Sequence, residues 1–170
     1  MKRSTGRAFI FSLIVFLVLN FLFYIISFAI GDILDSVFDT IADHPSSSVF
    51  LLIYPSRYFP WELITNSVDA SSFAFKFFYM AGLISFIIAA IVAGLMGSNI
   101  GESIGGWMIT AICYMLMFIA IISIDDFNLN YISFTATLID GIIRILITGT
   151  VNALIFGLLV ILIALIKGKK

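Results

Sequence analysis

The chain of 170 residues is 62% hydrophobic and 11% charged, and its formal net charge is −1. A soluble domain of this composition would expose large apolar patches, so the composition excludes that class. Several apolar runs reach the ~20 residues needed to cross a bilayer. We therefore expect an all-α integral membrane protein that forms a single domain over residues 1–170.

A basic segment leads into the first apolar run. Lys2, Arg3 and Arg7 lie before or at the start of a stretch from 8 to 30, which is longer than the apolar core of a typical signal peptide. We predict the first span here. Asn20 lies in the middle of this run, and we expect it to hydrogen-bond to a neighbouring helix. A contact with substrate is the alternative.

The segment 31–70 contains no run long enough to span a bilayer and is predicted to be an outer loop. It begins with apolar and acidic residues at helical spacing, which predicts a short amphipathic helix on the membrane surface. The acidic residues are Asp32, Asp35, Asp39 and Asp43. We interpret them as a solvated face, and a stripe that collects cations or docks a basic partner is the alternative.

Aromatic residues and prolines cluster between residues 49 and 61. Tyrosine and tryptophan rings favour the headgroup zone, so we predict that this stretch is an interfacial anchor. The alternative is a lid that covers an opening between helices. His44 precedes it, and one histidine cannot supply a multi-histidine metal site or a bis-histidine haem.

The second span is predicted over 71–96, and a small residue recurs in it at every fourth position. This ladder consists of Ala81, Ser85, Ala89, Ala93, Gly97, Gly101 and Gly105. Small residues let helix backbones approach closely in lipid. We therefore expect four of them to be helix-packing residues: Ala89, Ala93, Gly97 and Gly101.

The glycine-rich run 97–106 lacks the lysine and serine or threonine that complete a phosphate-binding loop. We interpret it as a tight cytoplasmic hairpin, and a substrate contact at Glu102 stays open. A third span follows over 107–124. Cys113 in it is the single cysteine, so no intramolecular disulfide is expected.

The last hydrophobic region, 131–166, is too long for one straight span, so we predict the fourth span over 146–166. Asp140 and Arg144 are four residues apart with the acid first, which favours an intrahelical ion pair at the interface. An ion or proton pathway that includes them and Asn152 is the alternative. Whether 131–145 continues the span or forms a separate interfacial helix stays open.

A second small-residue face is predicted in the fourth span, and we expect it to meet the ladder at 89–97. It consists of Gly149, Ala153 and Gly157.

Charge placement predicts the topology. Six of the nine basic residues lie at the two ends of the chain: Lys2, Arg3, Arg7, Lys167, Lys169 and Lys170. The positive-inside rule then puts both termini in the cytoplasm. An even number of spans follows, and four fit the apolar runs. We expect a four-helix bundle in the cell membrane.

We expect the protein to be an accessory or scaffold subunit of a multi-subunit membrane complex. No catalytic, metal, cofactor or nucleic-acid motif is found in the sequence, so we do not expect an enzyme, and the predicted partners are lipid and other membrane subunits or further copies of the chain. The alternative is an oligomeric small transporter or ion channel. Its path would be lined by Asp140, Arg144, Asn152, Asn20 and Glu102.

Overall fold

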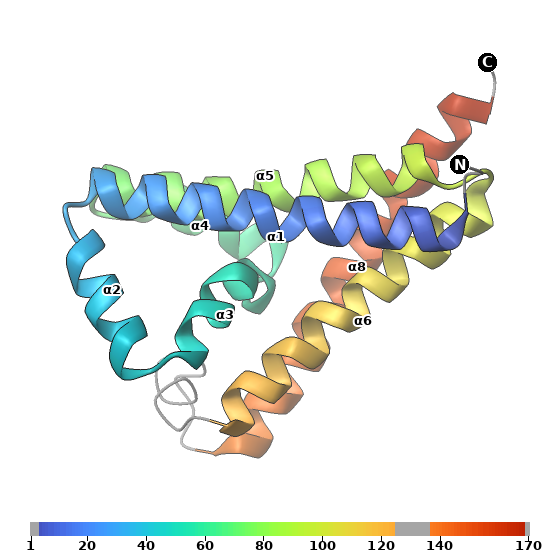
Figure 1. The fold of residues 1–170 in the computed structure, drawn as a ribbon. Coiled ribbons are helices and arrows are strands. Elements are labelled where there is room, and N and C mark those ends of the chain that lie inside the picture. The colour runs from blue at the N-terminus through green and yellow to red at the C-terminus, as the bar shows by residue number, and fades with distance from the viewer. Residues whose placement is uncertain (1–3, 125–136, 169–170) are drawn as a thin grey trace.

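The computed structural model describes residues 4–124 and 137–168, and these ranges are helical apart from short connections. Four helices are long and apolar enough to cross a membrane (Figure 1). They are α1 (Thr5–Ile30), α5 (Phe73–Met96), α6 (Ile100–Ile124) and α8 (Leu138–Gly168). An all-α chain with several membrane-spanning helices was predicted from the sequence, and the structure agrees at this level.

Polar side chains set where the long helices begin. Ser4 accepts a hydrogen bond from the Arg7 amide at 3.3 Å, and Ser72 accepts one from the Phe75 amide at 3.3 Å. Asn99 does the same for the Glu102 amide at 2.9 Å. A short side chain with an oxygen suits this position because it satisfies amides that have no partner within the helix.

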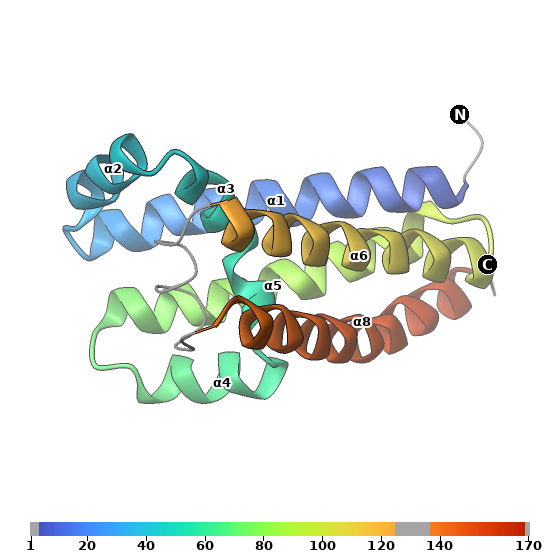
Figure 2. The ribbon, with the colours of Figure 1, turned by 90° about the horizontal axis from the view of Figure 1, so that it is seen from below.

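The four long helices form two pairs that diverge. Figure 1 shows α1 beside α5 and α6 beside α8, with the pairs close together near the chain termini and apart at the other end. Shorter helices lie at the wide end of the molecule (Figures 1 and 2). They are α2 (Leu34–Asp43), α3 (Ser46–Ile53), the 3-10 turn η1 (Tyr54–Arg57) and α4 (Pro60–Asp69).

Small residues bring the pairs together at the narrow end. A side chain at Gly106 of α6 would collide with Ala8 of α1. One turn further along, the hydroxyls of Ser12 and Thr110 share a hydrogen bond of 2.6 Å. A side chain at Gly94 of α5 would lie 2.8 Å from Ile163 of α8. Close backbone approach and short hydroxyl bonds are typical of helix contacts in lipid.

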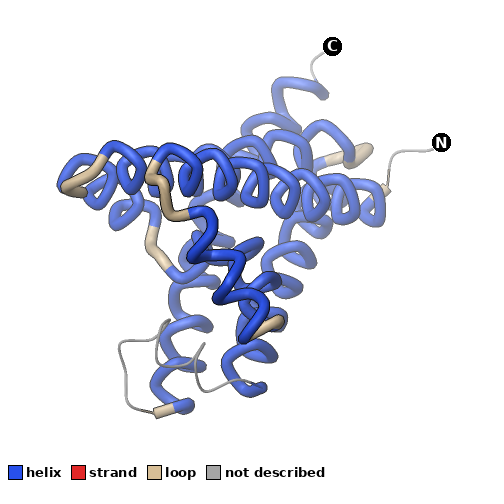
Figure 3. Tube along the Cα trace, turned by 60° about the vertical axis from the view of Figure 1, so that its left-hand side comes forward, coloured by secondary structure: helices blue, strands red, loops and turns tan. Residues whose placement is uncertain are grey.

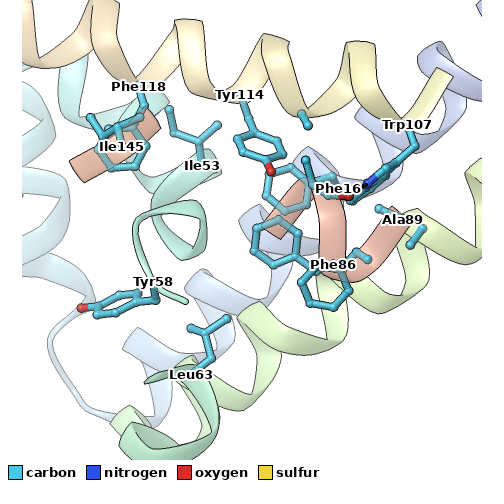
Figure 4. Close-up of a cluster of buried hydrophobic side chains, with 14 of the residues drawn as sticks. Phe16, Ile53, Tyr58, Leu63, Phe86, Ala89, Trp107, Tyr114, Phe118 and Ile145 are labelled. Atoms are coloured by element: carbon cyan, nitrogen blue, oxygen red, sulfur yellow. Dashed lines mark hydrogen bonds between the residues drawn. The ribbon is translucent and has the colours of Figure 1, made fainter. Parts of the chain in front are cut away.

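Aromatic rings from all four long helices meet in the core. Phe16 of α1 lies 4.8 Å from Phe86 of α5, and Phe86 stacks on Phe156 of α8 at 4.9 Å between ring centroids. Tyr114 of α6 completes the group at 5.5 Å from Phe16 (Figure 4). Offset and tilted aromatic pairs stabilise a core by more than the burial of their apolar area alone would.

The connection between α5 and α6 is shorter than predicted. Because α6 begins at Ile100, the expected hairpin over 97–106 is reduced to residues 97–99. The glycines of this run do not break the helix. Gly101 is exposed, and Gly106 provides the contact with α1.

The fourth long helix starts earlier than the predicted residue 146. Residues 138–145 continue α8 as one helix of 31 residues. At ~1.5 Å per residue it extends ~46 Å, so it is longer than a ~30 Å hydrocarbon core. The rest of the open stretch, 131–136, lies outside the described residues.

The two small-residue faces do not meet as expected. Gly149 of α8 lies against Met115 and Tyr114 of α6, and Gly157 lies near Trp107 of α6. Trp107 donates to the Ala153 oxygen at 2.9 Å, and Tyr114 donates to the Gly149 oxygen at 3.3 Å. The small residues of α8 therefore receive the large side chains of α6.

The ladder of α5 is buried over most of its length. Ala81, Ser85, Ala89, Ala93 and Gly97 are buried, whereas Gly101 is exposed. The tightest approaches of α5 occur beside the ladder, at Gly82 and Gly94. Gly97 itself packs on Ser103 of the following helix rather than on a distant one.

Candidate functional site: a buried arginine and an aromatic cavity

The chain between α3 and α4 enters the space between the two helix pairs. Pro55 and Pro60 interrupt helix formation, and between them the backbone passes through η1 to an extended Tyr58. Ser56, Arg57 and Tyr58 are buried, with exposed fractions of 3%, 3% and 7%. This part of the predicted anchor 49–61 therefore packs inside the molecule, whereas Trp61 at its end is 52% exposed.

Glycine makes room for this segment. A side chain at Gly82 of α5 would lie 2.8 Å from the ring of Pro55. Leu63 of α4 is buried beside the same glycine. Figure 4 shows Tyr58 and Leu63 below Ile53, on the side of the core away from Trp107. The segment is therefore seated by shape as well as by hydrogen bonds.

Two buried asparagines bind the backbone of this segment. Asn20 of α1 donates to the Leu52 oxygen at 2.9 Å. Asn152 of α8 donates to the Tyr58 oxygen at 3.0 Å and to the Ser56 oxygen at 3.4 Å. Non-helical backbone is tolerated at membrane depth only where protein or water satisfies it. The predicted hydrogen bond of Asn20 to a neighbouring helix is confirmed.

Arg57 lies between two tyrosine rings. Its guanidinium carbon is 4.9 Å from the centre of the Tyr54 ring and 4.7 Å from that of Tyr58. The two hydroxyls of these tyrosines share a hydrogen bond of 2.9 Å. A cation held over aromatic faces is attracted by their quadrupoles, most strongly where water is excluded.

Burial raises the pKa of the Tyr58 hydroxyl well above its ordinary value, and Tyr54 raises it further through charge repulsion and their shared hydrogen bond. The positive charge of Arg57 lowers the pKa of Tyr58, but this effect is smaller than that of burial. Tyr58 is therefore neutral at physiological pH. Its ring and hydroxyl act in packing and hydrogen bonding rather than as an anion.

A cavity of about 260 Å³ lies between α1, α2, α3 and α5. Seven aromatic side chains line it, among them Tyr24, Phe50 and Phe78. The apolar face of α2 closes one side with Val37 and Ile41. No charged side chain belongs to the lining within the described part of the chain. The site can accommodate an uncharged apolar group.

The residues predicted for a pathway are not brought together. Asp140 accepts a hydrogen bond from the Thr137 hydroxyl at 2.6 Å, at the start of α8. Arg144 forms its ion pair with Glu62 of α4, at 3.8 Å, rather than the predicted one within the helix. Asn152 lies eight residues further along α8, ~12 Å from Arg144. Glu102 accepts from the Ser98 amide at 2.8 Å, at the other end of the molecule.

Sequence reasoning missed Arg57 as a buried residue. The signal was present, because Arg57 lies between two prolines with a tyrosine on either side, at 54 and 58. An arginine among rings and helix breakers is a candidate for burial at a helix interruption. The cavity could not be found this way, since its lining comes from five separate elements, which are α1, α2, α3, η1 and α5.

Comparison with known proteins identifies no relative, since no family model, curated protein or solved structure matches the chain.

Proposed function

We propose that this protein is a small accessory or scaffold subunit of a multi-subunit complex in the cell membrane. In this proposal four helices span the bilayer as a bundle, both termini face the cytoplasm, and the α2–α4 segment lies toward the outer side. Partners bind through the apolar faces of the long helices, and no chemical reaction is involved.

This function is supported by the hydrogen bonds that the two buried asparagines donate to main-chain oxygens. Asn20 and Asn152 are 1% and 0% exposed. Asn20 donates to the Leu52 oxygen in the last turn of α3, and Asn152 donates to the Tyr58 oxygen between α3 and α4. Glu102 and Asp140 cap the ends of helices. Polar side chains in the long helices thus stabilise the fold, as expected for a protein whose role is packing.

Exposed apolar side chains offer the surface for partners. On α1 they include Ile14, Phe21 and Ile26, which are 51%, 50% and 44% exposed. In the most apolar stretch of 18 residues of α1, only 22% of the residues are buried inside the chain. This face contacts either lipid or another subunit, and a scaffold subunit would use part of it.

The test is isolation from the native membrane in mild detergent, with identification of copurifying subunits by mass spectrometry. We expect stoichiometric partners with the wild-type chain. Gly101→Leu fills an exposed small site of α6, where the Cβ of the new residue would meet only the Asn99 side-chain oxygen, at 3.4 Å. It should release a partner without lowering the temperature of thermal unfolding.

Gly6→Leu is the matched control, since Gly6 is also an exposed helical glycine, whose Cβ would meet only the Ser4 hydroxyl, at 3.8 Å. It should keep the partners. Wild-type protein that purifies without any stoichiometric subunit would contradict the proposal.

A second candidate function is an oligomeric small transporter or channel. It is supported by a row of polar side chains on α8, because Arg144, Thr148 and Asn152 follow one another at intervals of four. The Thr148 hydroxyl and the Asn152 carbonyl oxygen are buried and have no hydrogen-bond partner among the described residues. These oxygens could bind water or an ion in a passage that starts near Arg144 and Asp140.

Flux measurements in liposomes test this second candidate. Thr148→Val keeps the shape of the side chain and removes the hydroxyl, so it should reduce flux, and Asp140→Asn should reduce it as well. Wild-type liposomes without ion or solute flux would rule the candidate out.

A further inference from the structure

The cavity beneath α2 is bounded by parts of the long helices near their α2 ends. Tyr24 and Phe28 come from the last two turns of α1, and Phe75, Phe78 and Tyr79 come from the first two turns of α5. In Figures 1 and 3 this region lies beside α2, away from the meeting point of the two pairs. A bilayer around the long helices would therefore reach the cavity.

The lining defines the chemistry of an occupant. Among the described residues of the lining, seven are aromatic, four are aliphatic and three carry a serine or threonine hydroxyl. A site of this kind has few groups to orient a polar ligand and no countercharge for an ionic one. An apolar cavity of ~150 Å³ already binds a benzene molecule. The volume of about 260 Å³ here suits a longer stretch of hydrocarbon.

The covering helix α2 is incompletely packed. None of its residues, all of which the structure describes, is buried. Phe38 is 54% exposed, and Val37 and Ile41 on the cavity side are only partly buried. An amphipathic helix gains most of its stability from burying its apolar face. A hydrocarbon chain in the cavity would complete that burial.

The connections of α2 place it as a cover over the cavity. Asp32, between α1 and α2, has a φ of 53°, in the left-handed region that a non-glycine residue seldom adopts. At its other end α2 stops at Asp43, before His44 and Pro45. The Ile33 amide donates to the Phe28 oxygen at 3.1 Å, and the Ser47 amide donates to the His44 oxygen at 2.9 Å, so hydrogen-bonded turns at both ends hold α2 over the cavity.

We propose that this cavity binds one hydrocarbon chain of a membrane lipid, with α2 as its cover. The bilayer supplies this chemistry at high local concentration. The chain packs against the rings of α1, α3 and α5, and the apolar side of α2 closes over it. This binding is independent of the scaffold role, which uses the outer faces of the long helices.

The experiment uses the full chain in vesicles of phosphatidylethanolamine and phosphatidylglycerol that contain a phospholipid with a photoreactive diazirine in the middle of one chain. After illumination, digestion and mass spectrometry locate the labelled residues. We expect labelling at the cavity lining, at Tyr24 and Phe28 and in residues 33–54 and 75–79, in addition to the exposed faces of the long helices.

Ile41→Trp tests whether the label reflects the cavity, because an indole at this position fills the space from the α2 side. Labelling of Phe50, Tyr54 and Phe78 should then be lost. Phe38→Trp is the matched control, since Phe38 lies on the same helix but is not part of the lining. It should leave the labelling intact. Equal thermal unfolding of the two variants separates loss of binding from loss of fold.

Native mass spectrometry of the wild-type protein gives an independent readout. A phospholipid retained by each chain, and lost in Ile41→Trp, supports the inference. The inference is overturned if the lining is not labelled, if Ile41→Trp is labelled like the wild type, or if the retained molecule is not a lipid.

Discussion

Asn152 donates to the main-chain oxygen of Tyr58 at 3.0 Å and so joins the middle of α8 to a stretch of backbone that follows an interrupted helix. The bond is buried on both sides. A side chain of a long apolar helix thus satisfies a main-chain oxygen of the segment between α3 and α4. The stability of this segment should therefore depend in part on the Asn152 amide group.

Replacing Asn152 with leucine should free this segment. The Tyr58 and Ser56 oxygens would lose a donor inside the protein, at a cost of ~1–3 kcal/mol. We expect a lower unfolding temperature in detergent and faster amide hydrogen exchange over residues 54–60. Asn20→Leu should affect α3 instead, because Asn20 bonds to the Leu52 oxygen. Equal exchange patterns in the two variants would contradict this assignment.

Arg57→Lys should destabilise the protein although the charge is kept. An ammonium group cannot lie flat over the rings of Tyr54 and Tyr58 as a guanidinium does, and we expect a loss of ~1–2 kcal/mol. Near-ultraviolet circular dichroism should report the altered tyrosine environment during thermal unfolding. Arg144→Lys is the control, since its side chain is 40% exposed. Comparable losses at both positions would argue against the ring contacts.

The ion pair of Arg144 with Glu62 should contribute little. Both side chains are partly exposed, at 40% and 30%, and exposed pairs are worth less than ~1 kcal/mol. Glu62 also accepts from the Phe59 amide at 2.9 Å and so caps α4. We therefore expect Glu62→Ala to cost more stability than Arg144→Gln, and only the second loss to vanish at high salt. Chemical or thermal unfolding at two salt concentrations measures both.

Two glycines of α6 should respond in opposite directions to alanine. At Gly106 the new methyl group would overlap Ala8 and lie 2.7 Å from the Phe9 nitrogen, so we expect a loss of ~1–3 kcal/mol. At Gly101 it meets only the Asn99 oxygen at 3.4 Å, and alanine favours the helix by up to ~1 kcal/mol. Thermal unfolding of the two variants measures both changes in stability. A stable Gly106→Ala would refute the close crossing of α1 and α6.

The stability of the folded protein should depend on pH through Tyr58. Because its pKa is raised in the folded protein, the hydroxyl holds its proton more tightly there than in the unfolded chain. The resulting stability is fully present below the ordinary tyrosine pKa of ~10 and is lost as the pH rises above it. Tyr54→Phe removes a group that raises the pKa, so ionisation should begin at lower pH. Absorbance at 295 nm follows the titration, and ionisation of Tyr58 near pH 10 without unfolding would be inconsistent with its burial.

Hydrophobic patterning carried most of the information about the fold. Runs of apolar residues located the four long helices, and the alternation of aspartates with apolar residues located α2. Boundaries were less predictable where the local signal and the packing disagree. Glycines at 101, 105 and 106 indicate a turn, yet α6 continues through them because Asn99 caps the helix and Ala8 packs on Gly106.

The candidate site was predictable only in part. Asn20 was expected to bond to a neighbouring helix because a lone amide in an apolar run needs a partner. The ion pair of Arg144 was assigned by helical spacing, but Glu62, 82 positions away in the chain, lies in reach of it. Such contacts depend on where α4 is placed in space. No local pattern encodes that position.

The segment between α3 and α4 has a consequence for the biosynthesis of the protein. Its backbone partners are made at different times, since Asn20 precedes it and Asn152 follows Tyr58 by 94 residues. While the ribosome is still translating the middle of the chain, only the α3 end has its asparagine. The segment can take its final place only after the last helix has entered the membrane. A chain arrested before α8 should therefore leave residues 56–58 accessible to water, and completion of α8 is the step that closes the molecule.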